Sequence, residues 1–288
     1  MVSVSESVVK EISVRLVSSY IFLEVAEQCV EHMKAQLSSG AYDVNEDTLA
    51  TILTKGLQDV SHDKHIRVRR KNVAGTGNDE FTREASAREN HGFRKMEIFD
   101  HNIGYMELHY FAPTAWAAET VIGAMRFVSS TDALIIDLRK NGGGDPGLVA
   151  FICSYFFVER TLLNTVYWRQ NDFTEQFWTM EYVPGPLYID RPVYILTSSD
   201  TFSAAEEFAY SLKNLNRART VGEVTKGGAH PVDVIELPAG LEIVLPKGRA
   251  INPITKANWE GSGVAPTIES SADSALDVAL AEIRSILG

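Results

Sequence analysis

The stretch ALIIDLRKNGGG, residues 133–144, constrains the fold more than any other part of this sequence. Residues 133–138 are almost continuously apolar, which is typical of a strand buried on both faces of a sheet. Three glycines follow and lead to an apolar segment, 148–157, that we expect to be helical. Glycines at such a junction let backbone N–H groups approach a ligand or a developing oxyanion. A tight turn without a ligand is the alternative, but three consecutive glycines exceed what a turn needs.

A second buried strand, predicted at 192–197, leads through a short polar turn to Ser203 and a predicted helix at 204–215. The start of this helix would expose the Ser203 hydroxyl to the positive end of the helix, and the amide of Ala204 could face the same space. Both features suit a serine nucleophile with half of an oxyanion hole. Ser203 and Glu206 also have the spacing of a capping box, which stabilises a helix by about 1 kcal/mol and is common. Taken alone, this local sequence favours a helix-capping role of Ser203 over a role as a nucleophile.

Helical periodicity dominates the start of the chain. Apolar residues at spacings of three and four predict a helix over 7–38, divided by a break near Ser18–Tyr20. A further helix is expected at 49–60, with a capped start at Asn45 and Thr48. We therefore expect a small N-terminal helical unit.

The rest of the chain mixes strands and helices. We expect strands at 65–70, 93–99, 103–111, 218–221, 232–236 and 241–245, and helices at 114–128 and 274–287, the last capped by Asp273. The polar segment 71–90 is predicted to be a loop or lid. Helices followed by mixed elements indicate an α/β or α+β fold, with a helical domain at 1–62 and a core at 63–288.

Charge and cysteine content narrow the function. Lys and Arg number 27 against 38 Asp and Glu, for a net charge of −11, so nucleic-acid binding is excluded as a function class and anionic membranes are disfavoured. The start of the chain lacks the features of a signal peptide, and no apolar stretch is long enough for a membrane span. Cys29 and Cys153 form neither a disulfide framework nor a metal motif. We therefore expect a cytoplasmic protein without metal or cofactor, although a secreted mature chain would look the same.

Two further segments carry residues that could do chemistry. Residues 61–66 contain His62 and His65, and a histidine there is a candidate general base. No third ligand with sensible spacing accompanies them, so a metal site is not indicated. The irregular segment 252–266 contains Glu260, which could orient a histidine or could be a solvated loop charge.

Several segments, taken together and in order, are more specific than any one of them. They are ALIIDLRKNGGG, VYILTSSDTFSAAEEFAY, ARTVGEVTKGGAHP and NPITKANWEGSGVAP, preceded by LQDVSHDKHIRV. This set resembles the tail-specific (C-terminal-processing) serine protease superfamily. Within it, the branch of the interphotoreceptor retinoid-binding protein repeat is the most similar, with the core of tricorn protease nearby. The resemblance covers nearly the whole chain.

The resemblance implies a crotonase-like ββα spiral core behind a three-helix N-terminal domain. It implies that Ser203 is the nucleophile. It also implies an oxyanion hole formed by the amide of Ala204 and by a glycine of the NGGG segment, with Gly143 as the first choice and Gly142 as the second.

The resemblance leaves the general base open. Tail-specific proteases use a lysine 25 residues after the serine, but Gly228 occupies that position here and Lys226 lies two residues earlier. The tricorn-like pattern places a histidine near the start of the core and a glutamate near its end, which are His65 and Glu260 here. We therefore expect His65 to be the base and Glu260 to orient it. His230, and after it Lys226, is the alternative base.

The implied activity is that of a serine hydrolase that cleaves peptides through an acyl-enzyme, with a peptide or protein substrate. A homo-oligomer is compatible with the sequence. The same chemistry could pass the acyl group to an amine, in a peptide-processing or cyclising enzyme of a biosynthetic pathway.

A non-catalytic module for an apolar ligand, such as a retinoid or lipid, is the other alternative. The aromatic residues that could line its cleft are Trp116, Trp168, Phe173, Trp178 and Trp259. An enzyme is favoured because serine, histidine, glutamate and NGGG occur together. We expect 71–90 and 167–187 to determine specificity.

Overall fold

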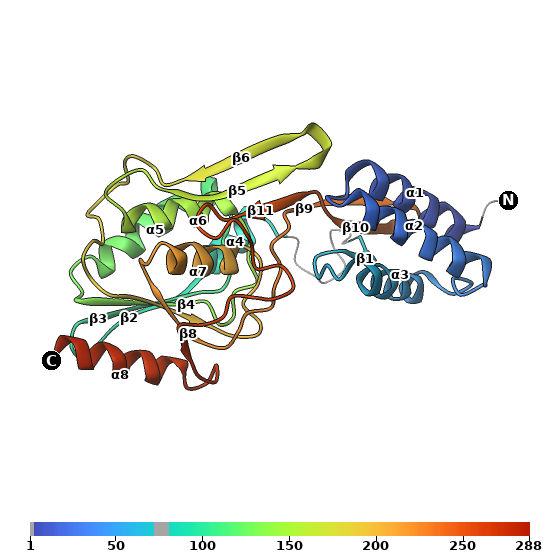
Figure 1. Ribbon diagram of the computed structural model, residues 1–288. Coiled ribbons are helices and arrows are strands. Elements are labelled where there is room, and N and C mark those ends of the chain that lie inside the picture. The colour runs from blue at the N-terminus through green and yellow to red at the C-terminus, as the bar shows by residue number, and fades with distance from the viewer. Residues whose placement is uncertain (1–2, 72–80) are drawn as a thin grey trace. The chain divides into compact units, whose positions relative to one another are not determined.

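The computed structural model describes residues 3–71 and 81–288, which belong to two compact units (Figure 1). The first unit takes its residues from 1–80, 166–175 and 230–250, and the second from 81–165, 176–229 and 251–288. Each unit is described by itself below. Among the described residues, no helix is both long enough and apolar enough to cross a membrane.

Three helices begin the first unit: α1 (Val4–Ser19), α2 (Leu23–Ser38) and α3 (Glu46–Ser61). The predicted division of the first helical stretch is confirmed, because α1 ends at Ser19 and α2 starts at Leu23. The predicted cap of α3 is also present, since Asn45 Oδ1 accepts a hydrogen bond from the amide of Thr48 at 2.9 Å.

A small antiparallel sheet completes the first unit. Its strand order is β1 (Arg67–Arg70), β10 (Leu241–Pro246) and β9 (Val232–Leu237). Leu241, Ile243 and Leu245 are fully buried in one cluster with the apolar residues of the helices. The first unit therefore extends beyond the predicted boundary at residue 62, because the apolar sides of the helices are covered by strands from much later in the chain.

The second unit is built on a six-stranded mixed sheet. Its strand order is β12 (Ile268–Glu269), β8 (Arg219–Gly222), β7 (Val193–Thr197), β4 (Ala133–Asp137), β3 (Ile103–Leu108) and β2 (Phe93–Phe99). All neighbours are parallel except β2 and β3, which form the predicted antiparallel pair. Every residue of β4 is buried, as its apolar sequence predicts.

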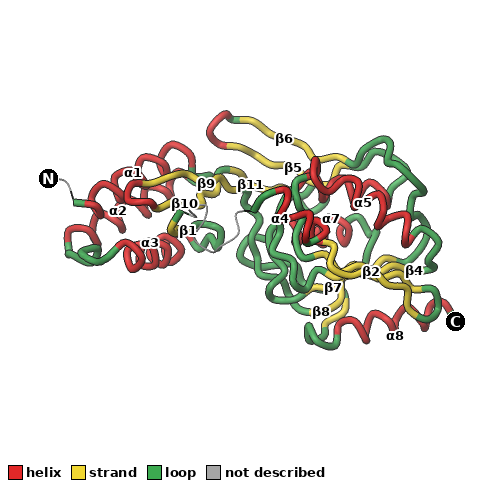
Figure 2. Tube along the Cα trace, turned by 180° about the vertical axis from the view of Figure 1, so that it is seen from behind, coloured by secondary structure: helices red, strands yellow, loops and turns green. Residues whose placement is uncertain are grey.

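Helices cover both faces of this sheet. Figures 1 and 2 show α5 (Thr114–Val128), α6 (Pro146–Cys153) and α7 (Ala204–Asn214) on one face and α8 (Ala275–Leu287) on the other. Ala275, Ala279 and Ile283 of α8 are fully buried in a cluster with Ile135 of β4 and Leu196 of β7. The α/β class with an N-terminal helical part is therefore confirmed.

Some predicted details were wrong or missing. The N-cap of α8 is Ser274 rather than Asp273, because the amide of Ser274 first closes a turn onto Ser271 and the helix starts one residue later. A short helix, α4 (Arg83–Arg88), lies within the predicted loop 71–90, of which 72–80 lies outside the described residues. Three strands were not predicted from the sequence. They are β5 (Leu162–Trp168), β6 (Phe173–Trp178) and β11 (Gly248–Ile251), which form a three-stranded sheet. The 3₁₀ turns are Asn90–Gly92, Ser154–Phe156, Arg169–Asn171 and Pro238–Gly240.

Candidate active site

The two segments with nucleophile and oxyanion-hole character follow neighbouring strands. Because β4 and β7 are adjacent and parallel, their carboxyl ends meet at one edge of the sheet, where ligands bind in open α/β sheets. The glycine run follows β4 and Ser203 follows β7. A Cβ atom added to Gly143 would lie only 2.7 Å from the Ser203 Cβ, so the two segments are in direct contact. The structure thus brings together the two segments that the sequence singled out.

Two positions of the glycine run require glycine for different reasons, one structural and one related to the candidate nucleophile. At Gly144, with φ +137°, an added Cβ would clash with the backbone of Phe111. At Gly143, with φ +107°, it would clash with Ser203. Buried Asn141 fixes the segment, because its side-chain amide donates to the carbonyl of Leu108 at 2.9 Å. Only glycine fits at either position. Gly144 therefore agrees with the interpretation as a tight turn, and Gly143 with the interpretation as part of a functional site.

Ser203 has a strained backbone. Its φ is 57° and its ψ is −122°, at the residue between the turn after β7 and the first residue of α7. A non-glycine residue in such a conformation costs about 1–3 kcal/mol, and residues of this kind cluster at functional sites. Serine hydrolases with a nucleophile elbow hold their serine on a sharp, strained strand-to-helix turn of this type. The sequence pattern gave no sign of this strain, since G-x-S-x-G is absent.

Glu206 holds this turn in place. Its side chain is fully buried, and Oε2 accepts the amides of Ser203 at 2.8 Å and Gly228 at 2.9 Å. Oε1 accepts the Thr225 hydroxyl at 2.5 Å and the amide of Gly227 at 2.6 Å. Burial raises the pKa of Glu206, and the four donors act in the opposite direction. The cap interaction suggested by the sequence is therefore part of a larger network that fixes the strained serine.

Two backbone amides beside Ser203 are available to stabilise an oxyanion. Among the described residues, the amides of Ala204 and Gly142 have no hydrogen-bond acceptor. The amide of Gly143 donates to Asn141 Oδ1 at 2.9 Å. Gly142 is exposed, and an added Cβ there would meet nothing within 4 Å. In this conformation Gly142, rather than the first choice Gly143, has the amide that is not already engaged.

A buried cluster in the first unit contains both candidate histidines. His230 Nδ1 and Asp63 Oδ2 lie 2.6 Å apart, and the two side chains are 4% and 2% exposed. The hydroxyl of Tyr20 donates to Asp63 Oδ2 at 3.3 Å, and the amide of His65 donates to Asp63 Oδ1 at 2.9 Å. Burial alone would raise the pKa of Asp63, but the hydrogen bond and charge of His230 hold it below its usual range. Local sequence gives no sign of a role for Asp63, because its partner lies 167 residues further along the chain.

The loop that contains Glu260 contacts the segment that precedes His230. Glu260 Oε2 accepts the amide of Ala229 at 2.5 Å, and the Trp259 indole donates to the carbonyl of Gly228 at 2.7 Å. Glu260 and Ser203 belong to the second unit, whereas His65 and His230 belong to the first. The predicted combination of Ser203, His65 and Glu260 therefore remains a prediction.

Lys226, the other alternative base, is exposed beside the serine turn. Its ammonium nitrogen lies 5.4 Å from the centroid of the Phe202 ring, and its amide donates to the carbonyl of Thr201 at 3.0 Å. Its backbone is therefore fixed to the turn that contains Ser203.

The aromatic residues proposed for an apolar-ligand cleft make interactions within the protein. Trp168, Trp178 and Trp259 donate their indole N–H groups to protein acceptors at 3.1, 3.2 and 2.7 Å. Trp116 packs against another aromatic ring, and Phe173 is 54% exposed. These contacts are those of structural and surface aromatics.

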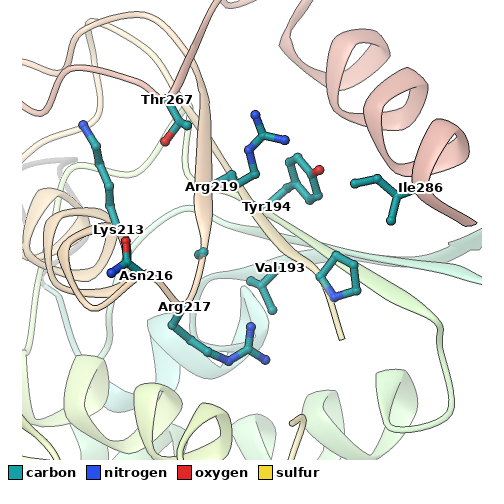
Figure 3. A pocket seen from close by; sticks show the side chains of 10 residues that line it. Val193, Tyr194, Lys213, Asn216, Arg217, Arg219, Thr267 and Ile286 are labelled. Carbon is teal, nitrogen blue, oxygen red and sulfur yellow. The ribbon is translucent and has the colours of Figure 1, made fainter. Parts of the chain in front are cut away.

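A pocket of about 390 Å³ lies at the other end of the same strands (Figure 3). It is lined by residues at the amino ends of β7 and β8, whereas Ser203 follows the carboxyl end of β7. Its cations have partners within the protein. Arg217 donates to three backbone carbonyls, Arg219 to Glu282 and Lys213 to one backbone carbonyl. This pocket is separate from the serine turn.

A strained serine beside unengaged backbone amides, at the carboxyl edge of a parallel sheet, is the arrangement of a serine hydrolase. Residues 102–270 match the model of peptidase family S41, and residues 3–97 match the model of the N-terminal domain of peptidase S41 in eukaryotic IRBP. The chain belongs to peptidase family S41. This confirms the family resemblance inferred from the four segments.

Individual relatives are similar to this chain in sequence, and solved structures are similar to it in fold. A carboxyl-terminal-processing protease of Synechocystis sp. is 32% identical over 146 residues, which cover 50% of this chain and 32% of the relative. The chain spans about a third of the length of the curated relatives that it matches. The photosystem II D1 C-terminal processing protease has a similar structure, with a TM-score of 0.60, 14% identity and coverage of 100% of this chain and 98% of that one. A lipoprotein of Streptococcus agalactiae is also similar, with a TM-score of 0.63, 15% identity and coverage of 99% and 98%.

Proposed function

We propose that the protein is a serine peptidase with Ser203 as its nucleophile. The observation that carries the proposal is the strained backbone of Ser203, at φ 57° and ψ −122°, on a strand-to-helix turn. The strain is maintained by Glu206, whose buried carboxylate binds the Ser203 amide. Such a conformation costs about 1–3 kcal/mol, persists only where the surrounding structure enforces it and is typical of active sites.

The proposed reaction passes through an acyl-enzyme. Ser203 Oγ attacks the carbonyl carbon of the scissile peptide bond while a histidine accepts the hydroxyl proton. The oxyanion accepts hydrogen bonds from the amide of Ala204 and from a glycine of the NGGG segment, Gly142 or Gly143. The C–N bond then breaks, and the protonated histidine returns the proton to the leaving amine. Water attacks the acyl carbon and loses a proton to the same histidine. The bond between that carbon and Ser203 Oγ then breaks, the histidine returns the proton to Oγ, and the new carboxyl terminus leaves.

The sequence predicts His65 as the proton acceptor and Glu260 as the carboxylate that orients it. The proposed substrate is a peptide or protein, because the family is one of peptidases and its curated relatives are named for the processing of carboxyl termini. An amine could replace water as the acyl acceptor. The same incubation would then yield a ligated or cyclised peptide rather than two hydrolysis fragments.

A fluorophosphonate probe tests the nucleophile. We expect the probe to attach covalently to Ser203, identified by mass spectrometry of the digested protein, and Ser203→Ala to abolish the attachment. Ser262→Ala removes an exposed hydroxyl elsewhere in the second unit and serves as the matched control, with labelling unchanged. Labelling that persists in Ser203→Ala, or an unlabelled wild type, would refute the proposal.

A further inference from the structure

We propose that Trp259 is a positioning residue for Ser203, which it holds through the backbone of Gly228 and the carboxylate of Glu206. The inference rests on the proposed serine-peptidase function and names a residue outside the reacting groups on which the geometry of the nucleophile depends. All four residues belong to the second unit. Trp259 is 2% exposed, so its contribution comes from the groups that it holds rather than from contact with a substrate.

A continuous series of hydrogen bonds joins the indole ring to the serine turn. The indole N–H of Trp259 donates to the carbonyl of Gly228 at 2.7 Å. The amide of Gly228 donates to Glu206 Oε2 at 2.9 Å, and the same oxygen accepts the amide of Ser203 at 2.8 Å. A shift of Gly228 therefore moves the oxygen atom that holds the strained backbone of Ser203.

The ring of Trp259 is itself fixed against the helix that follows Ser203. It packs on the ring of Tyr210, with 5.3 Å between the ring centroids and 46° between the ring planes. Tyr210 lies seven residues after Ser203, which is about two turns along α7 and on the same face of the helix. Trp259 thus contacts α7 with its ring and Gly228 with its indole N–H, and it fixes these two segments relative to each other.

The loop 259–264 packs against 225–228 backbone to backbone. A Cβ atom added to Gly227, at φ +84°, would lie 2.9 Å from backbone atoms of the loop, and one added to Gly263, at φ +71°, would lie 2.2 Å from a backbone carbonyl oxygen of 225–228. The segment 225–228 supplies three of the four hydrogen bonds that Glu206 accepts. Displacement of the loop is therefore transmitted to the carboxylate.

The test compares Trp259→Phe with Tyr210→Phe in the full chain. The readout is the first-order rate of labelling of Ser203 at a saturating concentration of the fluorophosphonate probe. Misplacement by about 1 Å can lower a rate about 100-fold, so we expect a loss of about 10- to 100-fold in Trp259→Phe. Tyr210→Phe removes an exposed hydroxyl that donates to Thr255 Oγ1 at 2.9 Å, and it should label at the wild-type rate.

The final extent of labelling separates positioning from stability. If Trp259 positions Ser203, the folded variant still reacts completely, so the slow reaction should end at about one probe per chain. The probe concentration that gives half of the maximal rate should stay unchanged. A purely structural defect would lower the final extent while the folded remainder reacts at the wild-type rate, and that result would overturn the assignment.

An isosteric replacement keeps the test valid if Trp259→Phe does not fold. Incorporation of 3-benzothienylalanine at position 259 keeps the shape of the bicyclic ring and removes only the N–H donor. We expect it to lower the labelling rate at least about tenfold with the final extent unchanged. A wild-type rate in this variant would overturn the role of the indole N–H.

A double-mutant cycle tests the route through Glu206. Glu206→Gln replaces one carboxylate oxygen with an NH₂ group, which cannot accept a hydrogen bond. Because residues of one network are not additive, we expect the double variant of Glu206→Gln and Trp259→Phe to label about as fast as Glu206→Gln alone. Two losses that multiply would mean that Trp259 acts by another route, which contradicts the proposal.

These outcomes are distinct from failure of the proposed function. A wild type labelled at Ser203, together with an undiminished rate in Trp259→Phe, would overturn the role of Trp259 and leave Ser203 as the nucleophile. An unlabelled wild type, in contrast, would refute the serine-peptidase function itself.

Discussion

Glu207 is a buried carboxyl group four residues after Ser203. It is 7% exposed, and burial raises its pKa to about 7, with Asp145 nearby contributing in the same direction. Its Oε1 atom has no hydrogen-bond partner among the described residues. Burial thus raises the pKa of both neighbours, Glu206 and Glu207. Four donors oppose the shift at Glu206, whereas at Glu207 only a hydrogen bond with Asn164 opposes it.

This difference predicts how stability depends on pH. In the folded state Glu207 has a pKa of about 7, above its value of about 4.3 in an unfolded chain, so the folded state binds the proton more tightly. Its stabilising contribution is complete below about pH 4 and is lost as the pH rises through about 7. Relative to Glu207→Gln, the wild type should lose about 3 kcal/mol of unfolding free energy between about pH 4 and pH 8.

Urea unfolding of the two proteins across this pH range measures the effect. Glu159→Gln, an exposed glutamate, is the control, and its stability curve should stay parallel to that of the wild type. Parallel curves for Glu207→Gln as well would show that Glu207 ionises like an exposed side chain.

At the scale of elements, the contact between the segments after β4 and β7 determines the geometry of the site. Gly143→Ala would force its Cβ against Ser203 and would place alanine at φ +107°. Gly142→Ala would add the same methyl group in open space while keeping the backbone amide. We expect Gly143→Ala to reduce fluorophosphonate labelling about 100-fold, because displacing the nucleophile or its oxyanion donors has effects of that order.

Gly142→Ala is the matched comparison and should stay within a few-fold of the wild type. Circular dichroism of both variants would separate a local displacement from a loss of fold. Similar labelling rates in the two variants would contradict this account of the glycine run.

The same elements explain how far the sequence could predict the structure. The strand at 133–137 and the helices at 114–128 and 204–214 follow from continuous or periodic apolar residues, which local sequence reveals directly. Strand β5 was missed because buried Asn164 and neighbouring Thr165 interrupt its apolar pattern. The strain at Ser203 and the pairing of Asp63 with His230 depend on contacts between distant segments. No local pattern records such contacts.

At the scale of the whole molecule, the first unit depends on distant parts of the chain. Ile243 of β10 is fully buried among apolar residues of α1, α2 and α3. Ile243→Ala should lower the unfolding free energy by about 2–5 kcal/mol, because it leaves a cavity in this core. We further expect the amides of α1 to α3 to exchange hydrogen faster, although the substitution lies on a strand more than 180 residues after α3.

Hydrogen–deuterium exchange followed by mass spectrometry measures that coupling. Val234→Ala, on the neighbouring strand β9, removes an exposed side chain and should leave helix protection unchanged. Unaltered exchange in α1 to α3 after Ile243→Ala would mean that the helices are stable without the strands.

The discontinuity of the first unit has a consequence for synthesis on the ribosome. The helices leave the exit tunnel first, but strands β9 and β10 are made only when translation reaches residues 232–246. At about 5–20 residues per second, the apolar sides of α1 to α3 therefore wait on the order of ten to thirty seconds for their cover. During that interval the nascent chain presents a hydrophobic surface that a ribosome-associated chaperone can bind.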